Sequence, residues 1–314
     1  MYKRVIRKLI KILDASIKEK PKQVPVVEPE NGLSTEELIA DLDQIPLEEG
    51  AVVFIHSGFK SIGAIKGGPD TVIDALLKSF VEKRNITVAM PSFTISGTME
   101  DSLTKGTKFD VRSSPTVFKD IPAAFLKYPN LERSVHPTHS VMAIGPKAKW
   151  LVENHHNCGT TFGVGSPFGK LLECKSYIMG LGSRLGTVTF YHALEDMEKD
   201  FPFRVYTENS PYPVKCVDWN GKTVKMNVSA HDGTISPVRI DRRNGGWLRE
   251  IYTKIFEDKA GLRWFTVGKA KTWTCDASEL YEIQKKLTFS GLSIYTTEQK
   301  MADYITDSLL SGDK

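Results

Sequence analysis

The stretch Arg133-Ser134-Val135-His136-Pro137-Thr138-His139-Ser140 brings a guanidinium, hydroxyls and two imidazoles together within eight residues. The apolar run that follows, residues 141–145, is typical of a short buried strand. Polar side chains at the edge of a strand are what a site for an anionic ligand needs. Three other segments repeat this layout of a strand, a turn and clustered small polar residues, so the layout itself indicates how the chain folds.

The composition is that of an ordinary soluble protein. The chain has 314 residues, 40% of them hydrophobic and 25% charged, with a net charge of +4. This length allows one large α/β domain or two smaller ones, and no apolar run approaches a membrane span. Nothing resembles a nucleic-acid-binding module, so a nucleic-acid partner is excluded. Four cysteines without metal-like spacing predict reduced thiols in a cytoplasmic protein: Cys158, Cys174, Cys216 and Cys275.

The first 32 residues form a separable extension. Residues 1–20 alternate apolar and basic side chains at helical spacing, and residues 21–32 hold three prolines and read as a linker. We favour a helix that packs on its own protein or on a second subunit of a homo-oligomer. The alternative is peripheral contact with an anionic membrane at the inner face. The main domain then covers residues 33–300, and residues 301–314 form a tail.

Alternating strand and helix signals predict the fold class. Ser34 and Glu37 form a capping box, and Asn220-Gly221 is a strong hairpin signal. Strands are expected at 51–55, 86–90, 140–144 and 177–181, the hairpin at 214–228, and helices at 70–80, after Ser166-Pro167, and at 247–256 and 277–287. We predict an α/β fold with a mixed, partly parallel central sheet flanked by helices, an inserted antiparallel hairpin and a helical C-terminal part.

Residues 56–68 are the first candidate for a ligand site. A predicted buried strand ends there in small polar residues, and a Gly-Gly pair then opens a helix. Backbone amides at such a turn bind phosphate oxygens, and Lys60 could add a positive charge. The residue order of a Walker loop is absent, and a turn that only meets backbone geometry is the alternative.

Other glycine and histidine patterns are weaker signals. Gly163-x-Gly165 and Gly180-x-Gly182 lack the third glycine and the acidic residue of a dinucleotide fingerprint, so we interpret them as turns and exclude a nicotinamide site. His155-His156-x-Cys158 has no obvious further ligands. A solvated histidine pair is favoured there, and no metal is predicted.

His192 and Glu195 are the second candidate. They stand three residues apart in a segment of helical pattern, so their side chains face the same side of a helix. A carboxylate beside an imidazole raises its basicity and fixes its tautomer, which is a general-base arrangement. The spacing alone would favour a buried structural histidine. It is also half of a di-metal helix motif, but no second half appears.

Taken together, these segments resemble the antibiotic acetyltransferase family, the aminoglycoside 3-N-acetyltransferases and their relatives. The resemblance spans about residues 35–281 and rests on five segments in the expected order. They are His56-Ser57-Gly58-Phe59-Lys60-Ser61-Ile62-Gly63 with Gly67-Gly68-Pro69, Met90-Pro91-Ser92-Phe93-Thr94, Arg133-Ser134-x-His136-Pro137-x-x-Ser140, Gly163-x-Gly165-Ser166-Pro167 and His192-x-x-Glu195.

The resemblance implies direct transfer of an acyl group, such as acetyl, from coenzyme A to an amine of a sugar, with acyl-CoA as cosubstrate. It implies that His192 is the general base, that Glu195 orients it, and that a hydroxyl of Thr94 or Ser92 binds the tetrahedral intermediate or the leaving thiolate. The implied coenzyme contacts are His56, Ser57, Gly58, Phe59, Lys60, Ser61, Ile62, Gly63, Arg133, Ser134, His136 and Ser140.

The acceptor is predicted from charge. A polycationic acceptor calls for clustered carboxylates, but the segments 95–120 and 196–204 mix both signs, and basic residues follow at 239–243. We therefore expect an anionic acceptor, a nucleotide-linked amino sugar of surface-polysaccharide synthesis, contacted by Asp196 and Arg204. One alternative is an aminoglycoside 3-N-acetyltransferase that confers antibiotic resistance. A second is a non-catalytic coenzyme A-binding or scaffold protein.

Overall fold

The computed structural model describes residues 32–295, apart from 96, 107, 236–253 and 256. The predicted helix of residues 1–20 and the tail at 301–314 lie outside the described residues, as does most of the helix expected at 247–256. Contact of residues 1–20 with a membrane or a second subunit therefore stays a prediction. No helix among the described residues has the length and apolarity needed to cross a membrane.

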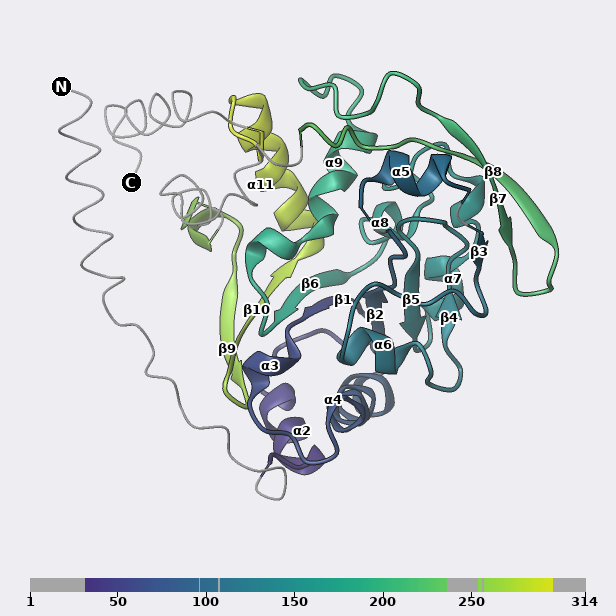
Figure 1. Ribbon diagram of the computed structural model, residues 1–314. Helices are drawn as coiled ribbons and strands as arrows, with labels where there is room; N and C mark the ends of the chain where they lie inside the picture. The colour runs from purple at the N-terminus through teal and green to yellow at the C-terminus, as the bar shows by residue number, and fades with distance from the viewer. Residues whose placement is uncertain (1–31, 96, 107, 236–253, 256, 296–314) are drawn as a thin grey trace, which may run out of the picture.

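A seven-stranded sheet runs through the centre of the molecule (Figure 1). Its strands in spatial order are β4 (Glu132–Arg133), β5 (Val141–Ile144), β2 (Thr87–Pro91), β1 (Val52–Ser57), β6 (Ser176–Leu181), β10 (Ala270–Asp276) and β9 (Arg263–Val267). The three central strands are parallel, because β1 pairs parallel with both β2 and β6. The outer strands pair antiparallel.

The order of the central strands creates a switch point at β1. The chain leaves β1 towards β2 on one side, and β6 later pairs on the other. In open α/β sheets, ligands bind beyond the carboxyl ends of the strands at such a point. The register places Ser57 opposite Leu181, so β1 and β6 end side by side.

Helices cover both faces of the sheet, because β1 alternates its apolar side chains between two cores. Val53 and Ile55 pack with one group of helices, and Val52 and Phe54 with the other. The first group is α2 (Thr35–Asp43), α4 (Pro69–Leu76) with the π-helix η2 (Leu77–Glu82), and α6 (Ile121–Phe125). The second is α7 (Ala148–Val152), α8 (Pro167–Lys170), α9 (His192–Met197) and α11 (Ala277–Phe289).

A smaller sheet and two short helices complete the described structure. The sheet consists of β3 (Phe109–Asp110), β7 (Tyr212–Val217) and β8 (Thr223–Val228), and its hairpin extends away from the main sheet in Figure 1. Helix α5 (Met99–Thr104) packs on it, and α3 (Phe59–Ile62) follows β1. Three 3₁₀ turns are η3 (His155–Asn157), η4 (Leu185–Thr187) and η5 (Thr189–Tyr191).

The predicted fold class is confirmed, although several strands were missed. The capping box of Ser34 and Glu37, the hairpin and the helix at 277–289 are present. Strands β9 and β10 were not predicted. Most of β9 is exposed at the sheet edge, so it lacks the continuous apolar run by which buried strands are found.

Candidate active site

The loops that follow β1 and β6 pack directly against each other. A side chain at Gly58 would place its Cβ 2.4 Å from the carbonyl oxygen of Gly182, and Gly182 itself has a φ of +65°. Only glycine allows both the close approach and the left-handed backbone. The two glycines therefore bring the segment 57–61 against the end of β6. The interpretation of Gly180-x-Gly182 as a turn is correct for Gly182 only, because Gly180 lies within β6.

A cavity of about 280 Å³ lies beside this loop. Residues 57–61 of the predicted coenzyme segment line part of it. Residues 118–122, at the start of α6, line the rest, and the sequence did not indicate them as coenzyme contacts. Lys60 lies on one wall and Lys119 on the other, and both side chains are exposed. The cavity is lined by Ser57, Gly58, Phe59, Lys60, Ser61, Phe118, Lys119, Asp120, Ile121 and Pro122.

Two buried polar atoms next to this cavity lack hydrogen-bond partners among the described residues. They are Nε2 of His56 and Oγ of Ser57. His56 lies on the same face of β1 as Phe54, and their ring centroids are 5.3 Å apart. Burial lowers the pKa of His56 to about 4, so the ring is neutral at neutral pH. Unsatisfied buried polar groups are costly, and at a strand end they indicate a place for water or a ligand.

Arg133 is directed into the protein. Its guanidinium donates to Oγ of Ser92 (2.9 Å) and Oγ of Ser140 (3.2 Å), and to the carbonyl oxygens of Ser114 (2.6 Å) and Ser92 (3.1 Å). The residue is 2% exposed, and burial lowers its pKa to about 10. Arg133 and Ser140 thus bind their own chain, and their predicted contact with coenzyme A stays a prediction that this geometry does not favour.

Ser134 and His136 are also used internally. The amide of His139 donates to Nδ1 of His136 (3.0 Å), and the ring of His136 stacks on His155 at 4.4 Å. Nδ1 of His155 bonds to the hydroxyl of Ser134, and Nε2 to the carbonyl oxygen of Thr161, both at 2.9 Å. The expected solvated pair at 155–156 is therefore wrong for His155, which is 1% exposed.

The two candidate hydroxyls differ in position. Ser92 is fully buried, and its Oγ lies 3.1 Å from Oγ of Ser140 while it accepts from Arg133. Thr94 is partly exposed, and its hydroxyl donates to the carbonyl oxygen of Pro137. Thr94 is therefore the hydroxyl better placed to meet a substrate.

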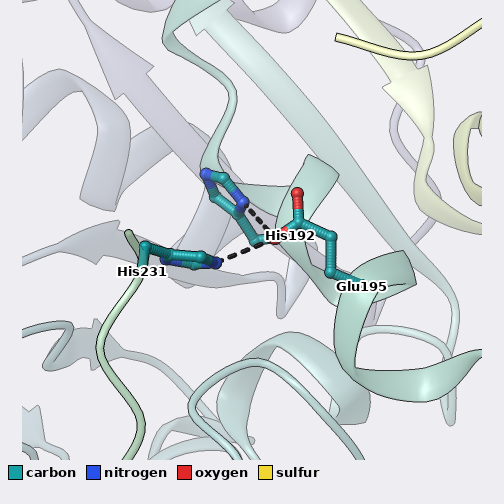
Figure 2. Close-up of side chains that lie close together, drawn as sticks. All are labelled: His192, Glu195 and His231. Carbon is teal, nitrogen blue, oxygen red and sulfur yellow. Dashed lines mark hydrogen bonds and ion pairs between the residues drawn. The ribbon is translucent and has the colours of Figure 1, made fainter. Parts of the chain in front are cut away.

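The predicted pair of His192 and Glu195 forms on α9. Nδ1 of His192 lies 2.8 Å from Oε2 of Glu195, as Figure 2 shows. The helix begins at His192, so a one-turn spacing directs both side chains to the same side. The side chain of Glu195 is 1% exposed and that of His192 8%. A carboxylate that accepts from Nδ1 leaves the lone pair of a neutral imidazole on Nε2.

Two further residues, which sequence reasoning missed, bind the same carboxylate. Nε2 of His231 lies 2.8 Å from Oε2, so both imidazoles converge on one oxygen (Figure 2). The hydroxyl of Tyr295 lies 2.6 Å from the other oxygen, Oε1. His231 is 36 residues from Glu195 in a loop after β8, and no motif marked it. Only the fold brings these residues together.

The site holds Glu195 as a carboxylate. Burial opposes its ionisation, but the charge of His192 and hydrogen bonds from His192 and His231 outweigh burial and hold the pKa of Glu195 well below its usual value. The aromatic rings of Phe162 and Tyr206 border the imidazoles, with Phe162 at 5.1 Å from His192 and Tyr206 stacked on His231 at 4.9 Å. These rings limit the access of water to the pair.

The two residues predicted for the acceptor differ in burial. Asp196 accepts from the amide of Phe162 (2.7 Å) and from the hydroxyl of Tyr206, and burial raises its pKa despite these bonds. Arg204 is exposed and pairs with Glu208 at 3.3 Å. Asp196 thus anchors the chain beside the pair, while Arg204 lies at the surface, and acceptor contact by either stays a prediction.

The converging atoms are also a donor set that a metal ion could use. One nitrogen each of His192 and His231 and a carboxylate oxygen of Glu195 lie within 4.8 Å of one another. Two imidazoles and a carboxylate are ligands that zinc accepts. Hydrogen bonds from the N–H groups of His192 and His231 to one oxygen of Glu195 account for the same distances, so the geometry does not require an ion.

Comparison with known proteins supplies the family. The family described as aminoglycoside 3-N-acetyltransferase matches residues 54–288, which includes the coenzyme segment, the segment 133–140 and the pair on α9. The chain belongs to this family. It is therefore an N-acyltransferase that uses an acyl-CoA, and the hypothesis of a non-catalytic scaffold loses its support.

Individual relatives agree with the family. An aminoglycoside N(3)-acetyltransferase III from a Salmonella species is 26% identical over 76% of this chain and 85% of its own length. The crystal structure of aminoglycoside acetyltransferase AAC(3)-Xa has a TM-score of 0.65 at 24% identity, covering 81% of this chain and 92% of that one. The binary structure of AAC-IIIb with CoASH has a TM-score of 0.64 at 22% identity, covering 81% and 95%. Both structures share the fold.

These findings correct the prediction of a nucleotide-linked amino-sugar acceptor. The family and its relatives are aminoglycoside acetyltransferases, which was the stated alternative. Counting charges along the chain misled the prediction, because it ignored which charges are already paired. Arg112 pairs with Asp110 at 2.7 Å and Lys105 with Asp101 at 2.9 Å. The basic residues at 239–243 lie outside the described residues.

Proposed function

We propose that this enzyme transfers an acetyl group from acetyl-CoA to the 3-amino group of an aminoglycoside. The observation that carries the proposal is the buried carboxylate of Glu195, 2.8 Å from Nδ1 of His192, within a chain of this family. A positioned imidazole is the group that such a reaction needs, because an amine attacks a thioester only after it has lost its proton.

His192 is the general base in this proposal. Its Nδ1–H donates to Glu195, so Nε2 takes the proton as the amine nitrogen bonds to the thioester carbonyl carbon. The carbon–sulfur bond then breaks, and the imidazolium returns the proton to the leaving thiolate. Glu195 stabilises the imidazolium that exists between these two steps. His231 helps to hold the carboxylate in place through the same oxygen, Oε2, at 2.8 Å.

The cavity between the segment 57–61 and Lys119 is the proposed place of coenzyme A. Lys60 and Lys119 supply positive charge from both walls, which suits the phosphates of the coenzyme. The unpaired atoms of His56 and Ser57 are available to a bound ligand or an ordered water. Gly58, Phe59, Ser61, Ile62 and Gly63 contribute the turn and its backbone amides.

Thr94 is the proposed hydroxyl at the reacting carbonyl. It lies just beyond β2, whose carboxyl end is beside that of β1, and it is less buried than Ser92. A hydroxyl that gives up its bond to Pro137 could donate to the oxygen of the tetrahedral intermediate. Ser92, which is buried and accepts a hydrogen bond from Arg133, then stabilises the end of β2.

Carboxylates near His231 suit a polycationic acceptor. Asp232 is the next residue, and the amide of His231 contacts the sulfur of Met99 on α5, which also carries Glu100 and Asp101. Hydrogen bonds from Thr234 lower the pKa of Asp232. The ionised carboxylate of Asp232 would attract an aminoglycoside.

The test is thiol release from acetyl-CoA with gentamicin, kanamycin, sisomicin and a panel of nucleotide-linked amino sugars. We expect release with at least one aminoglycoside and acetylation of its 3-amino group by NMR of the product. The His192→Ala variant serves as the control for enzymatic transfer. Release with nucleotide-linked amino sugars alone, or acetylation at another nitrogen, would contradict the proposal.

A further inference from the structure

We infer that Tyr295 is a positioning residue for the acetyl transfer, supplied by the segment that follows α11. This inference rests on the proposed function, because Tyr295 acts through Glu195 and His192. The family match ends at residue 288, so Tyr295 lies outside the part of the chain that the family defines. The hydroxyl of Tyr295 donates to Oε1 of Glu195 at 2.6 Å.

The segment after α11 is anchored so that this contact is fixed. The helix ends at Phe289, and the amide of Leu292 bonds back to the carbonyl oxygen of Leu287 at 2.8 Å. Leu292 is 1% exposed and Ile294 4%, and both belong to the core beneath α9. Two buried aliphatic side chains hold a short segment firmly, because exposing them to water would be unfavourable.

The ring of Tyr295 is fixed from the side by aromatic contacts. Its centroid lies 5.5 Å from that of Phe203 and 6.5 Å from that of Phe201. Its amide donates to Oγ of Ser293 at 3.1 Å. A tyrosine held at both its backbone and its ring presents its hydroxyl with little loss of entropy on bonding.

The carboxylate of Glu195 needs this third donor. Its side chain is 1% exposed, so water does not reach it freely, and both imidazoles bond to Oε2 alone. Without Tyr295, Oε1 would be a buried charged oxygen that lacks this donor, and the carboxylate could rotate to satisfy it. Rotation would misalign Nδ1 of His192 and hence the lone pair on its Nε2. Tyr295 therefore keeps the base aligned.

The chain offers a matched control for this contact. The hydroxyl of Tyr281 bonds to Oε1 of Glu198 at 2.8 Å, and Glu198 is the residue that caps the same helix, α9. This second tyrosine–glutamate bond lies at the end of α9 away from His192, and Lys285 pairs with the same oxygen at 2.6 Å. Loss of the Tyr281 hydroxyl removes the same chemistry without touching Glu195.

The experiment compares Tyr295→Phe with Tyr281→Phe in the full chain, using acetyl-CoA and gentamicin. We expect Tyr295→Phe to lower kcat about tenfold, the effect of one charged hydrogen bond on the barrier, with KM for acetyl-CoA within about twofold. Tyr281→Phe should keep wild-type kcat. Equal kcat values in both variants would overturn the inference.

A second readout does not depend on turnover. Imidazole protons in hydrogen bonds to Glu195 should give low-field NMR signals, assigned by their loss in His192→Ala and His231→Asn. We expect these signals to shift in Tyr295→Phe and to stay in place in Tyr281→Phe. Unmoved signals would refute the inference even if the proposed function held. A wild type that is inactive on every aminoglycoside, with signals that shift as expected, would count against the proposed function alone.

Discussion

The segment 133–140 and helix α9 carry similar side chains but use them differently. In the segment 133–140, Arg133, Ser134 and His136 turn inward and bond to their own chain. On α9, two imidazoles and a tyrosine converge on the single carboxylate of Glu195, at the border of the core. The most conspicuous motif of the sequence thus bonds within its own chain, whereas the short helix holds the proposed general base.

The difference lies in charge as well as in position. Burial holds His136 and His155 neutral, since no carboxylate of the described residues bonds to either ring, and it lowers the pKa of His155 to about 3. Glu195, in contrast, is kept ionised by the imidazoles around it. His136 and His155 are thus buried as neutral groups, whereas His192 bonds to an ionised carboxylate, as the proposed general base requires.

The largest effect expected is loss of stability in Arg133→Met. Removing the guanidinium leaves the carbonyl oxygens of Ser92 and Ser114 without a donor in the core, which should cost about 3 kcal/mol of unfolding free energy. Arg112→Met is the control, because Arg112 is exposed and solvent screens its bond to Asp110, so its loss should change the unfolding free energy far less. Denaturant unfolding measures both.

A normal stability of Arg133→Met would contradict the contrast drawn between the segment 133–140 and helix α9. If Arg133 touched the coenzyme, Arg133→Met would fold with normal stability and show a raised KM for acetyl-CoA. A stable variant with a raised KM would support the predicted contact between Arg133 and coenzyme A.

Glu195→Gln should affect turnover more than stability. The amide has the same shape as the carboxylate, but it has only one acceptor oxygen. Three donors now bond to the two oxygens of Glu195, so in the variant the tautomer of His192 is no longer fixed. We expect kcat to fall by about ten- to a hundredfold, with KM for acetyl-CoA little changed. Steady-state kinetics decides this, and a wild-type kcat would show that Glu195 is only structural.

The buried histidines His155 and His56 should make the stability of the fold depend on pH. The pKa of His155 is lowered to about 3 and that of His56 to about 4, both by burial. Below about pH 6.5 the unfolded chain binds these protons and the folded chain does not, so stability falls as the pH falls from 6.5 towards 4. Each ring adds up to about 1.4 kcal/mol per pH unit.

Unfolding free energies at about pH 7, 6 and 5 measure this slope. His155→Gln should flatten the slope by the share of one ring. His156→Gln, in the half-buried neighbour, should change it less. A slope that is the same in His155→Gln and in the wild type would mean that His155 is not held neutral in the fold.

Much of the fold could be predicted because its signals are local. The capping box at Ser34, the hairpin turn at Asn220-Gly221 and the apolar runs of β1, β2 and β6 each depend on neighbours in the sequence. The pair on α9 was found for the same reason, since one helical turn relates His192 to Glu195. Patterns among residues that are close in the sequence are enough to predict such features.

The rest of the site depends on contacts that no local pattern records. His231 and Tyr295 reach Glu195 from a loop after β8 and from beyond α11, and Lys119 lines the same cavity as Lys60. The same limit explains the misjudged acceptor. Whether Arg112 or Lys105 is available to a ligand depends on its partner, Asp110 or Asp101, and not on the count of charges.

The central claim is that His192 removes the proton from the acceptor amine. Its most direct test is the pH dependence of thiol release by His192→Ala with acetyl-CoA and gentamicin, from about pH 6.5 to about pH 9.5. We predict a loss of roughly a hundredfold or more near neutral pH, and a steep recovery at high pH, where the amine loses its proton to solvent. A correctly folded variant with near wild-type turnover at neutral pH, or a loss that stays constant with pH, would contradict the account.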